Sequence, residues 1–286
     1  MNKDARLSAL AEFLSAHRAR LQPVDVGLPA GTRRRTPGLR REEVAQLAGV
    51  STTWYTWLEQ GREITVSTQV MECIASALRL NEDERHYLFT LASEQPIQPT
   101  VATDTETAAP IPPSLQMLLT ELASCPAIIS DRRCQIVGWN EAAAAIFMDF
   151  NLVPPEDRNL IWLLFTRKEF RALAANWYEF VCGFLAIFRY YYGRYVGDPW
   201  YGAFIERLSK QNPDFVSLWN RNDVSPGPEV FIEFRHAKAG KMLFDLSSLQ
   251  VQGQTDLRMS VYTPSLGSDT ALKLKHVMDR LNTGKS

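Results

Sequence analysis

Hydrophobic residues in the first ninety positions recur every three or four residues, which is the spacing of one face of a helix. Leu7, Leu10, Phe13, Leu14 and Leu21 form such a stripe and predict a first helix. Ser67 and Asn81 are candidate N-caps of two later helices. The other four helices are expected at residues 39–48, 52–60, 68–80 and from 81 onward. The pattern therefore predicts an all-α, five-helix N-terminal domain.

The later part of the chain contains short apolar runs bounded by turn residues, which are typical of strands. Asn140 follows the second of these runs and is a candidate N-cap of a helix. The expected strands are residues 127–130, 135–139, 229–234, 242–249 and 256–263. Two early and three late strands with helices between them predict an α+β domain with an antiparallel sheet of about five strands.

Residues 95–113 contain five prolines, no lysine or arginine and no aromatic residue. This composition is typical of a linker. We therefore expect a helical domain at 1–94, a Pro-rich linker at 95–113 and an α+β domain at 114–286.

Residues 41–62, REEVAQLAGVSTTWYTWLEQGR, have the pattern of two short helices joined by a tight turn. Gly49 fits a turn position that needs positive φ, and Ser51 is a candidate N-cap of the second helix. This order and spacing are what a DNA-binding helix-turn-helix requires. Its second helix presents Thr52, Thr53 and Thr56 outward, whereas the helical spacing of Trp54 and Trp57 favours core positions.

Charge is distributed unevenly along a chain whose net charge is only −1. Residues 1–62 hold ten Lys or Arg and six Asp or Glu, whereas the remainder holds twenty-one and twenty-six. A basic N-terminal region next to a helix-turn-helix suggests contacts with DNA phosphates. The candidate phosphate contacts are Arg33, Arg34, Arg35, Arg40 and Arg41.

Residues 5–92 resemble the lambda-repressor-like, or XRE-type, helix-turn-helix family. The segments VGLPAGTRRRTPGLRREEVA and GVSTTWYTWLEQGR resemble a narrower group, the MmyB-like transcription regulators. The resemblance implies that Arg41 buttresses the recognition helix and touches phosphate or base, while Arg40 adds charge at the DNA backbone. It also places Thr52 and Thr53 at the first base-facing positions and Thr56 on the next turn.

The likeness to the MmyB-like group continues at residues 154–165, 197–200 and 212–224. In addition, the predicted hairpin at 127–139, followed by Asn140 and a helix, resembles the opening of a PAS domain. These resemblances imply a PAS-like ligand-binding domain, with long-chain fatty acids as the ligand class.

Residues 177–204 contain twelve of the thirty aromatic residues of the chain. One interpretation is a helix that packs into the core on all sides. The other is an apolar pocket for a small molecule, with tyrosine hydroxyls as polar groups and with Arg189 and Arg194 holding a carboxylate. The candidate ligand-binding residues are Trp139, Phe184, Phe188, Arg189, Tyr191, Tyr192 and Arg194.

The sequence contains no familiar catalytic or metal-binding motif. Four histidines are scattered, and four cysteines form no C-x-x-C pair. We therefore expect a protein that is not an enzyme, has no metal site and requires no cofactor. Buried reduced thiols, the lack of a signal peptide and the lack of a membrane-spanning run predict a cytoplasmic protein.

These observations favour a one-component, sequence-specific transcription regulator that binds double-stranded DNA and senses an apolar small molecule, with a fatty acid as the expected ligand. A homodimer is expected, because one short helix discriminates few base pairs. Two alternatives keep the DNA-binding domain. In one, the second domain is a ligand-free dimerisation module, and in the other it is a haem or flavin PAS sensor.

Overall fold

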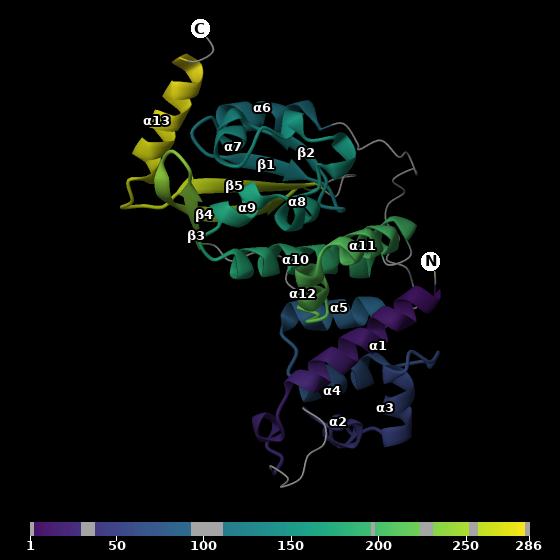
Figure 1. Cartoon of the computed structure of the whole chain (residues 1–286). Helices are drawn as coiled ribbons and strands as arrows, with labels where there is room; N and C mark the ends of the chain where they lie inside the picture. The colour runs from purple at the N-terminus through teal and green to yellow at the C-terminus, as the bar shows by residue number, and fades with distance from the viewer. Residues whose placement is uncertain are drawn as a thin grey trace. The chain divides into compact units, whose positions relative to one another are not determined.

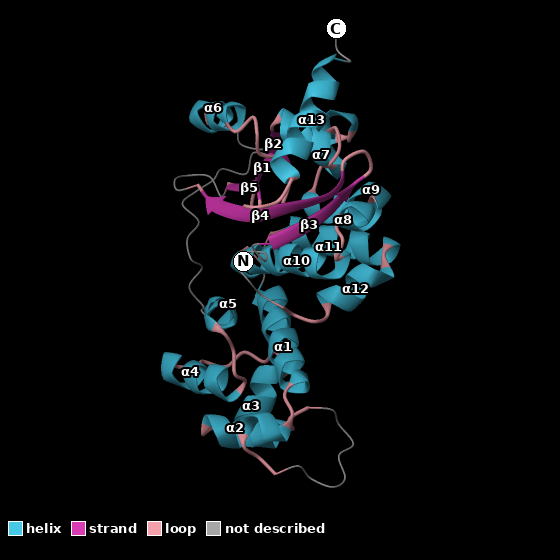
Figure 2. Ribbon diagram, turned by 90° about the vertical axis from the view of Figure 1, so that its left-hand side faces the viewer, coloured by secondary structure: helices cyan, strands magenta, loops and turns pink. Residues whose placement is uncertain are grey.

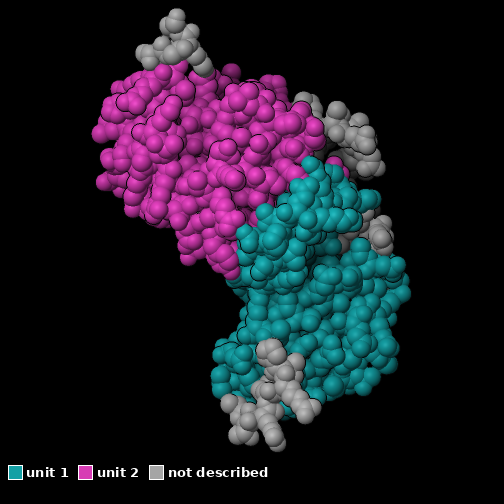
Figure 3. Space-filling view, in the orientation of Figure 1, with its two compact units in different colours: residues 1–99, 189–226 teal, residues 100–188, 227–286 magenta. Residues whose placement is uncertain are grey.

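The computed structural model describes residues 3–29, 38–92, 111–195, 198–223, 231–251 and 257–283. The chain divides into two compact units, which are coloured separately in Figure 3. Unit 1 comprises residues 1–99 and 189–226, and unit 2 comprises residues 100–188 and 227–286. The boundary between the units falls within one helix, α10 (Trp177–Arg194).

The N-terminal part of unit 1 consists of the five helices that the periodicity predicts (Figure 1). A short 3₁₀ turn, Pro23–Val26, follows the first helix. The helices are α1 (Lys3–Arg20), α2 (Arg41–Ala48), α3 (Thr52–Glu59), α4 (Thr68–Ala77) and α5 (Glu82–Ala92). The five predicted helices are therefore confirmed, with helix ends shifted by a few residues.

Local capping interactions explain where these helices begin. The hydroxyls of Ser51 and Ser67 each accept a hydrogen bond from the backbone N–H three residues later, at 3.1 and 3.3 Å. Asn81 and Glu84 form a reciprocal capping box with two bonds of 2.9 Å. Gly49 ends α2 with φ of +67°, as the turn requires.

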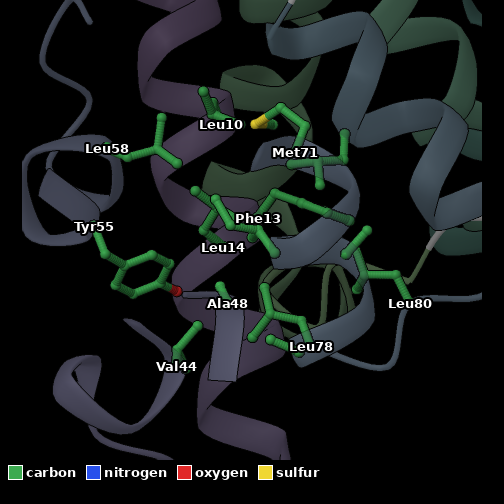
Figure 4. Close-up of a cluster of buried hydrophobic side chains, with 14 of the residues drawn as sticks. Leu10, Phe13, Leu14, Val44, Ala48, Tyr55, Leu58, Met71, Leu78 and Leu80 are labelled. Carbon is green, nitrogen blue, oxygen red and sulfur yellow. The ribbon is translucent and has the colours of Figure 1, made fainter. Parts of the chain in front are cut away.

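A hydrophobic core holds the five helices together, and Figure 4 shows part of it. Phe13 and Leu14 of α1, Val44 of α2, and Tyr55 and Leu58 of α3 are fully or almost fully buried. Helices α2 and α3 share this apolar core. Because each of these helices is only eight residues long, this packing supplies most of their stability.

The remainder of unit 1 comes from residues 189–194 at the end of α10 and from two further helices, α11 (Pro199–Gln211) and α12 (Pro213–Trp219). Tyr190 and Tyr192 of α10 pack against the core of the five helices. The buried ring of His17 lies 3.3 Å from the carbonyl oxygen of Asn222. Burial, with the nearby charge of Arg20, lowers the pKa of His17 to about 4, so this ring is neutral at pH 7.

Unit 2 contains a five-stranded antiparallel sheet with strand order β2-β1-β5-β4-β3. The strands are β1 (Ala127–Ser130), β2 (Ile136–Trp139), β3 (Phe231–His236), β4 (Gly240–Gln250) and β5 (Arg258–Pro264). The helices are α6 (Pro113–Glu121), α7 (Glu141–Ile146), α8 (Leu160–Thr166), α9 (Lys168–Leu173), the first part of α10 and α13 (Thr270–Thr283), with 3₁₀ turns at Phe150–Leu152 and Pro155–Asp157. The predicted α+β fold with five strands is confirmed.

Helices lie on both sides of the sheet (Figure 2). Successive strand residues point to opposite faces, so Val261 and Tyr262 of β5 belong to different layers. Val261 packs in a cluster with Leu119 of α6. On the other face, the ring of Tyr262 lies 4.9 Å from that of Phe147, which itself packs against Phe234 of β3 at 5.5 Å.

The four cysteines are free thiols, as the sequence predicts. Cys134 is buried, but Cys73 is exposed, so the expectation that all four are buried is wrong. Cys73 lies on the solvent side of α4, opposite the buried Met71 and Ile74. Of the helices within the described ranges, none has the length and apolar character to cross a membrane.

Gly193 of α10 contacts the aromatic ring of Tyr87 of α5, and a Cβ atom at this position would overlap that ring. Gly193→Ala should therefore lower the free energy of unfolding by about 1–3 kcal/mol. Gly202 of α11 is the matched control, because a Cβ there meets no atom within 4 Å. Gly202→Ala should be neutral or stabilise by up to about 1 kcal/mol. Chemical denaturation measures both, and equal effects of the two variants would contradict the packing described.

Candidate nucleic-acid interface and ligand site

Helix α3 has one buried and one exposed face. Tyr55, Leu58 and Glu59 are buried, whereas Thr52 and Thr53 are exposed at its N-terminal end and Thr56 is half-buried on the next turn. The three threonines predicted to face DNA therefore lie at the surface of a helix whose other face is anchored in the core. This is the arrangement that a recognition helix needs.

A buried carboxylate fixes the position of α3. Both oxygens of Glu59 accept hydrogen bonds from Arg18 of α1, each at 2.7 Å, and one accepts a further bond from Arg41 of α2 at 2.9 Å. The Glu59 side chain has no exposed surface. Burial alone would raise the pKa of Glu59, but the hydrogen bonds and charge of the two arginines lower it below 4.5. Glu59 thus connects α1, α2 and α3 as a charged group.

The five arginines predicted to contact DNA phosphates divide into three groups. Arg33, Arg34 and Arg35 lie outside the described residues. Arg40 is the exposed N-cap residue of α2, and its guanidinium lies 3.4 Å from Glu42. Arg41 is partly exposed and pairs with Glu59 of α3, and its expected contact with phosphate or base stays a prediction.

The two tryptophans of α3 differ. Trp54 packs against the core, as expected. Trp57 is 40% exposed, so the expectation of a core position is wrong for this residue. It lies one turn after Thr53 on the outward side of the helix, and the Arg62 guanidinium lies 5.7 Å from its ring centre.

Three of the predicted ligand-binding residues lie in unit 2. Phe184 and Phe188 are buried on α10, and the Phe184 ring packs against that of Phe180 at 5.0 Å. Trp139 is half-buried on β2, with its ring 5.3 Å from that of Phe150. Phe184 and Phe188 are therefore core side chains, whereas Trp139 is only partly covered.

The other four residues, Arg189, Tyr191, Tyr192 and Arg194, belong to unit 1. Arg189 is buried, and burial lowers its pKa from the usual arginine value. Its guanidinium donates to the Asn222 side chain at 2.6 Å and to the Trp219 carbonyl, and it lies 3.7 Å from the Trp219 ring centre. Arg189 is thus held by Asn222 and Trp219, and the expectation that the seven residues form one ligand pocket stays a prediction. The aromatic helix packs on several sides, and its residues are divided between two units.

A cleft in unit 2 was not anticipated from the sequence. Its volume is about 380 Å³, and it lies between the start of α10 and the edge strand β3. Phe180 and Phe231 supply aromatic surface, and Phe231 is 56% exposed. Arg235 and Glu233 supply charge, and Glu233 also pairs with Lys241 at 2.6 Å. The complete lining consists of Ala174, Ala175, Asn176, Glu179, Phe180, Phe231, Ile232, Glu233 and Arg235.

Sequence reasoning missed Glu59, Arg18 and this cleft. Glu59 could have been noticed as a carboxylate at a core-facing position of the predicted α3, because a buried charge requires a partner. The sequence offers no signal that selects Arg18, which is 41 residues away. Within the ranges that the structure describes, no group of three or more His, Cys, Asp or Glu is arranged to hold a metal ion.

Comparison with protein-family models gives two matches. Residues 111–276 match the MmyB-like transcription regulator ligand binding domain, and residues 9–88 match a helix-turn-helix domain. A search of curated proteins gave no match. The first match covers more than half of the chain and includes α11 and α12 of unit 1.

Glu59→Gln should lower the free energy of unfolding by about 3 kcal/mol at pH 7, because it leaves the largely buried Arg18 without an anionic partner. The folded-state pKa of Glu59 is depressed, so the stability that its charge contributes is present above pH 4.5 and is lost as the pH falls through the folded value. The difference between wild type and variant should therefore shrink at acid pH. Glu42→Gln, at an exposed position of α2, is the control, and a difference independent of pH would contradict the ion cluster.

Proposed function

The chain belongs to the MmyB-like transcription regulator family, and on that premise we propose that it is a one-component regulator. In this proposal α3 binds a specific DNA sequence, and the second domain senses an apolar small molecule. The ligand binds one of two conformations of the protein more tightly and so shifts the population toward it, and the two conformations differ in their affinity for DNA. Neither matched family is of a catalytic kind, and we assign no catalytic step to the chain.

One observation supports the DNA-binding proposal most directly. Helix α3 exposes a face with three threonines, and its opposite face is packed into the core. Thr52, Thr53 and Thr56 present hydroxyl and methyl groups, both of which contact base edges in the major groove. Arg40 at the start of α2, with Arg33, Arg34 and Arg35 as expected from the sequence, neutralises phosphates beside that groove. We propose a homodimer on two half-sites, acting in the cytoplasm.

The cleft of unit 2 supports the proposal of an apolar ligand with a carboxylate, such as a long-chain fatty acid. Phe180, Phe231 and Ile232 form an apolar surface for an acyl chain. Arg235 takes the role first expected of Arg189, because its guanidinium lies at the cleft and is largely exposed. The likeness to PAS domains remains part of this proposal.

Two other functions of the second domain are distinguished by simple measurements. A ligand-free dimerisation module would give a stable dimer from which an organic extract yields no small molecule. A haem sensor would give a visible absorption band, but none of the nine residues that line the cleft is the His, Cys, Met or Tyr that haem iron requires. A flavin would likewise be seen by its absorption. Recovery of a fatty acid from purified protein favours the proposal made here.

Selection of bound oligonucleotides from a random pool tests DNA recognition directly. For the selected site, Thr52→Ala combined with Thr53→Ala should weaken binding by tenfold or more, because a well-paired base contact contributes about 1–3 kcal/mol. Binding to unrelated DNA should change little, since phosphate contacts supply it. Thr120→Ala, at an exposed position of α6, is the control. Equal losses on specific and unrelated DNA would contradict a base-reading role of these threonines.

Phe231→Ala tests the ligand site. A fatty acid that covers this exposed ring should lose about tenfold in affinity when the ring is removed. Titration calorimetry with a saturated long-chain fatty acid gives the measurement. Leu152→Ala removes an 80%-exposed apolar side chain elsewhere in unit 2 and should leave the affinity unchanged. If the Phe231→Ala variant binds the fatty acid as tightly as the wild type does, the cleft is not the ligand-binding site.

A further inference from the structure

Trp57 is a large apolar side chain on the exposed face of α3, the helix whose other face packs into the core. Its neighbours on the outward side are Thr53, four residues earlier, and Thr56. Residues three and four apart in a helix lie on the same face, so Thr53 is next to both Thr56 and Trp57, and the three side chains form one surface. This surface is the part of α3 available to a partner.

The chemistry of this surface is unusual for a helix that binds bases. Direct readout by hydrogen bonds commonly uses Arg or Lys for guanine and Asn or Gln for adenine. Within α3, the exposed and half-buried outward positions at 52, 53, 56 and 57 are three threonines and one tryptophan. Their common feature is apolar carbon, and the apolar group that the major groove offers is the C5-methyl of thymine.

The surroundings of Trp57 keep the ring at the surface. Tyr55 and Leu58, its neighbours on the inner side, are already buried in the core. Glu59 holds the end of the helix through Arg18 and Arg41, so α3 is not free to rotate and bury the ring. The guanidinium of Arg62 lies within cation–π range of the ring, at 5.7 Å from its centre.

We propose that Trp57 is a specificity-determining residue that contacts a thymine methyl group in the major groove. This inference rests on the proposed function, namely that α3 binds a specific DNA sequence. It predicts that the selected sites contain an invariant T·A pair facing Trp57 and that binding depends on the C5-methyl group of its thymine. An amide that reads the adenine of such a pair would not depend on that methyl group. Arg62 orients the ring and adds positive charge beside it.

Replacement of thymine by deoxyuridine in the selected site removes only the C5-methyl group and so tests the proposal. At the pair that faces Trp57, this replacement should weaken binding of the wild-type protein about fourfold, the effect expected for one buried methyl group. Trp57→Ala should lose affinity for the thymine site and should bind the thymine and deoxyuridine sites equally. Trp57→Phe should retain part of the preference, because an aromatic ring remains.

Tyr178→Ala is the matched control, since it removes an aromatic side chain of similar exposure in unit 2 and should keep the fourfold preference. Thermal unfolding of Trp57→Ala verifies that the variant folds. A methyl preference that persists in Trp57→Ala, or that is absent at every thymine in the wild type, overturns the inference. Failure of the wild-type protein to select any DNA sequence would overturn the proposed function itself, so the two failures are distinguishable.

Discussion

The contact of Glu59 with Arg18 and Arg41 is the interaction on which the DNA-binding part of the structure depends. It brings one carboxylate and two guanidiniums from three different helices into a single hydrogen-bonded group. Helices as short as α2 and α3 have little stability of their own. The ion cluster and the apolar core together set the angle at which α3 presents its outward face, and removal of the carboxylate would leave a buried guanidinium unpaired.

The aromatic helix α10 contributes to two cores. Its first part, with Phe184 and Phe188, belongs to unit 2, which holds the sheet, and its end, residues 189–194, belongs to unit 1, which holds the helix-turn-helix. In unit 1, the side chain of Asn222 accepts a hydrogen bond from Arg189, and the backbone carbonyl of Asn222 lies within hydrogen-bond distance of His17. The segment that matches the ligand-binding family therefore includes residues that pack with α1 and α5. In the proposed function, a ligand that alters α10 would act on these contacts through the same helix.

Local interactions made much of the fold predictable. The helix-turn-helix follows from an apolar periodicity, from the serine caps at 51 and 67, and from Gly49 in the left-handed region. The five strands follow from short apolar runs between turn residues, and Asn140 caps α7 as expected. Each of these signals depends on residues no more than a few positions apart, which a single sequence displays directly.

The sequence by itself determined the elements, the fold class and the three threonines that α3 presents outward, because helix period and capping are local. Only the tertiary structure decided that Arg18 pairs with Glu59 across 41 residues, that Arg189 is held by Asn222, and that Trp57 is exposed. These outcomes depend on which side chains fill the space between elements distant in the chain. Two tryptophans at helical spacing look alike in a sequence, and only the packing of neighbouring helices buries one and leaves the other at the surface.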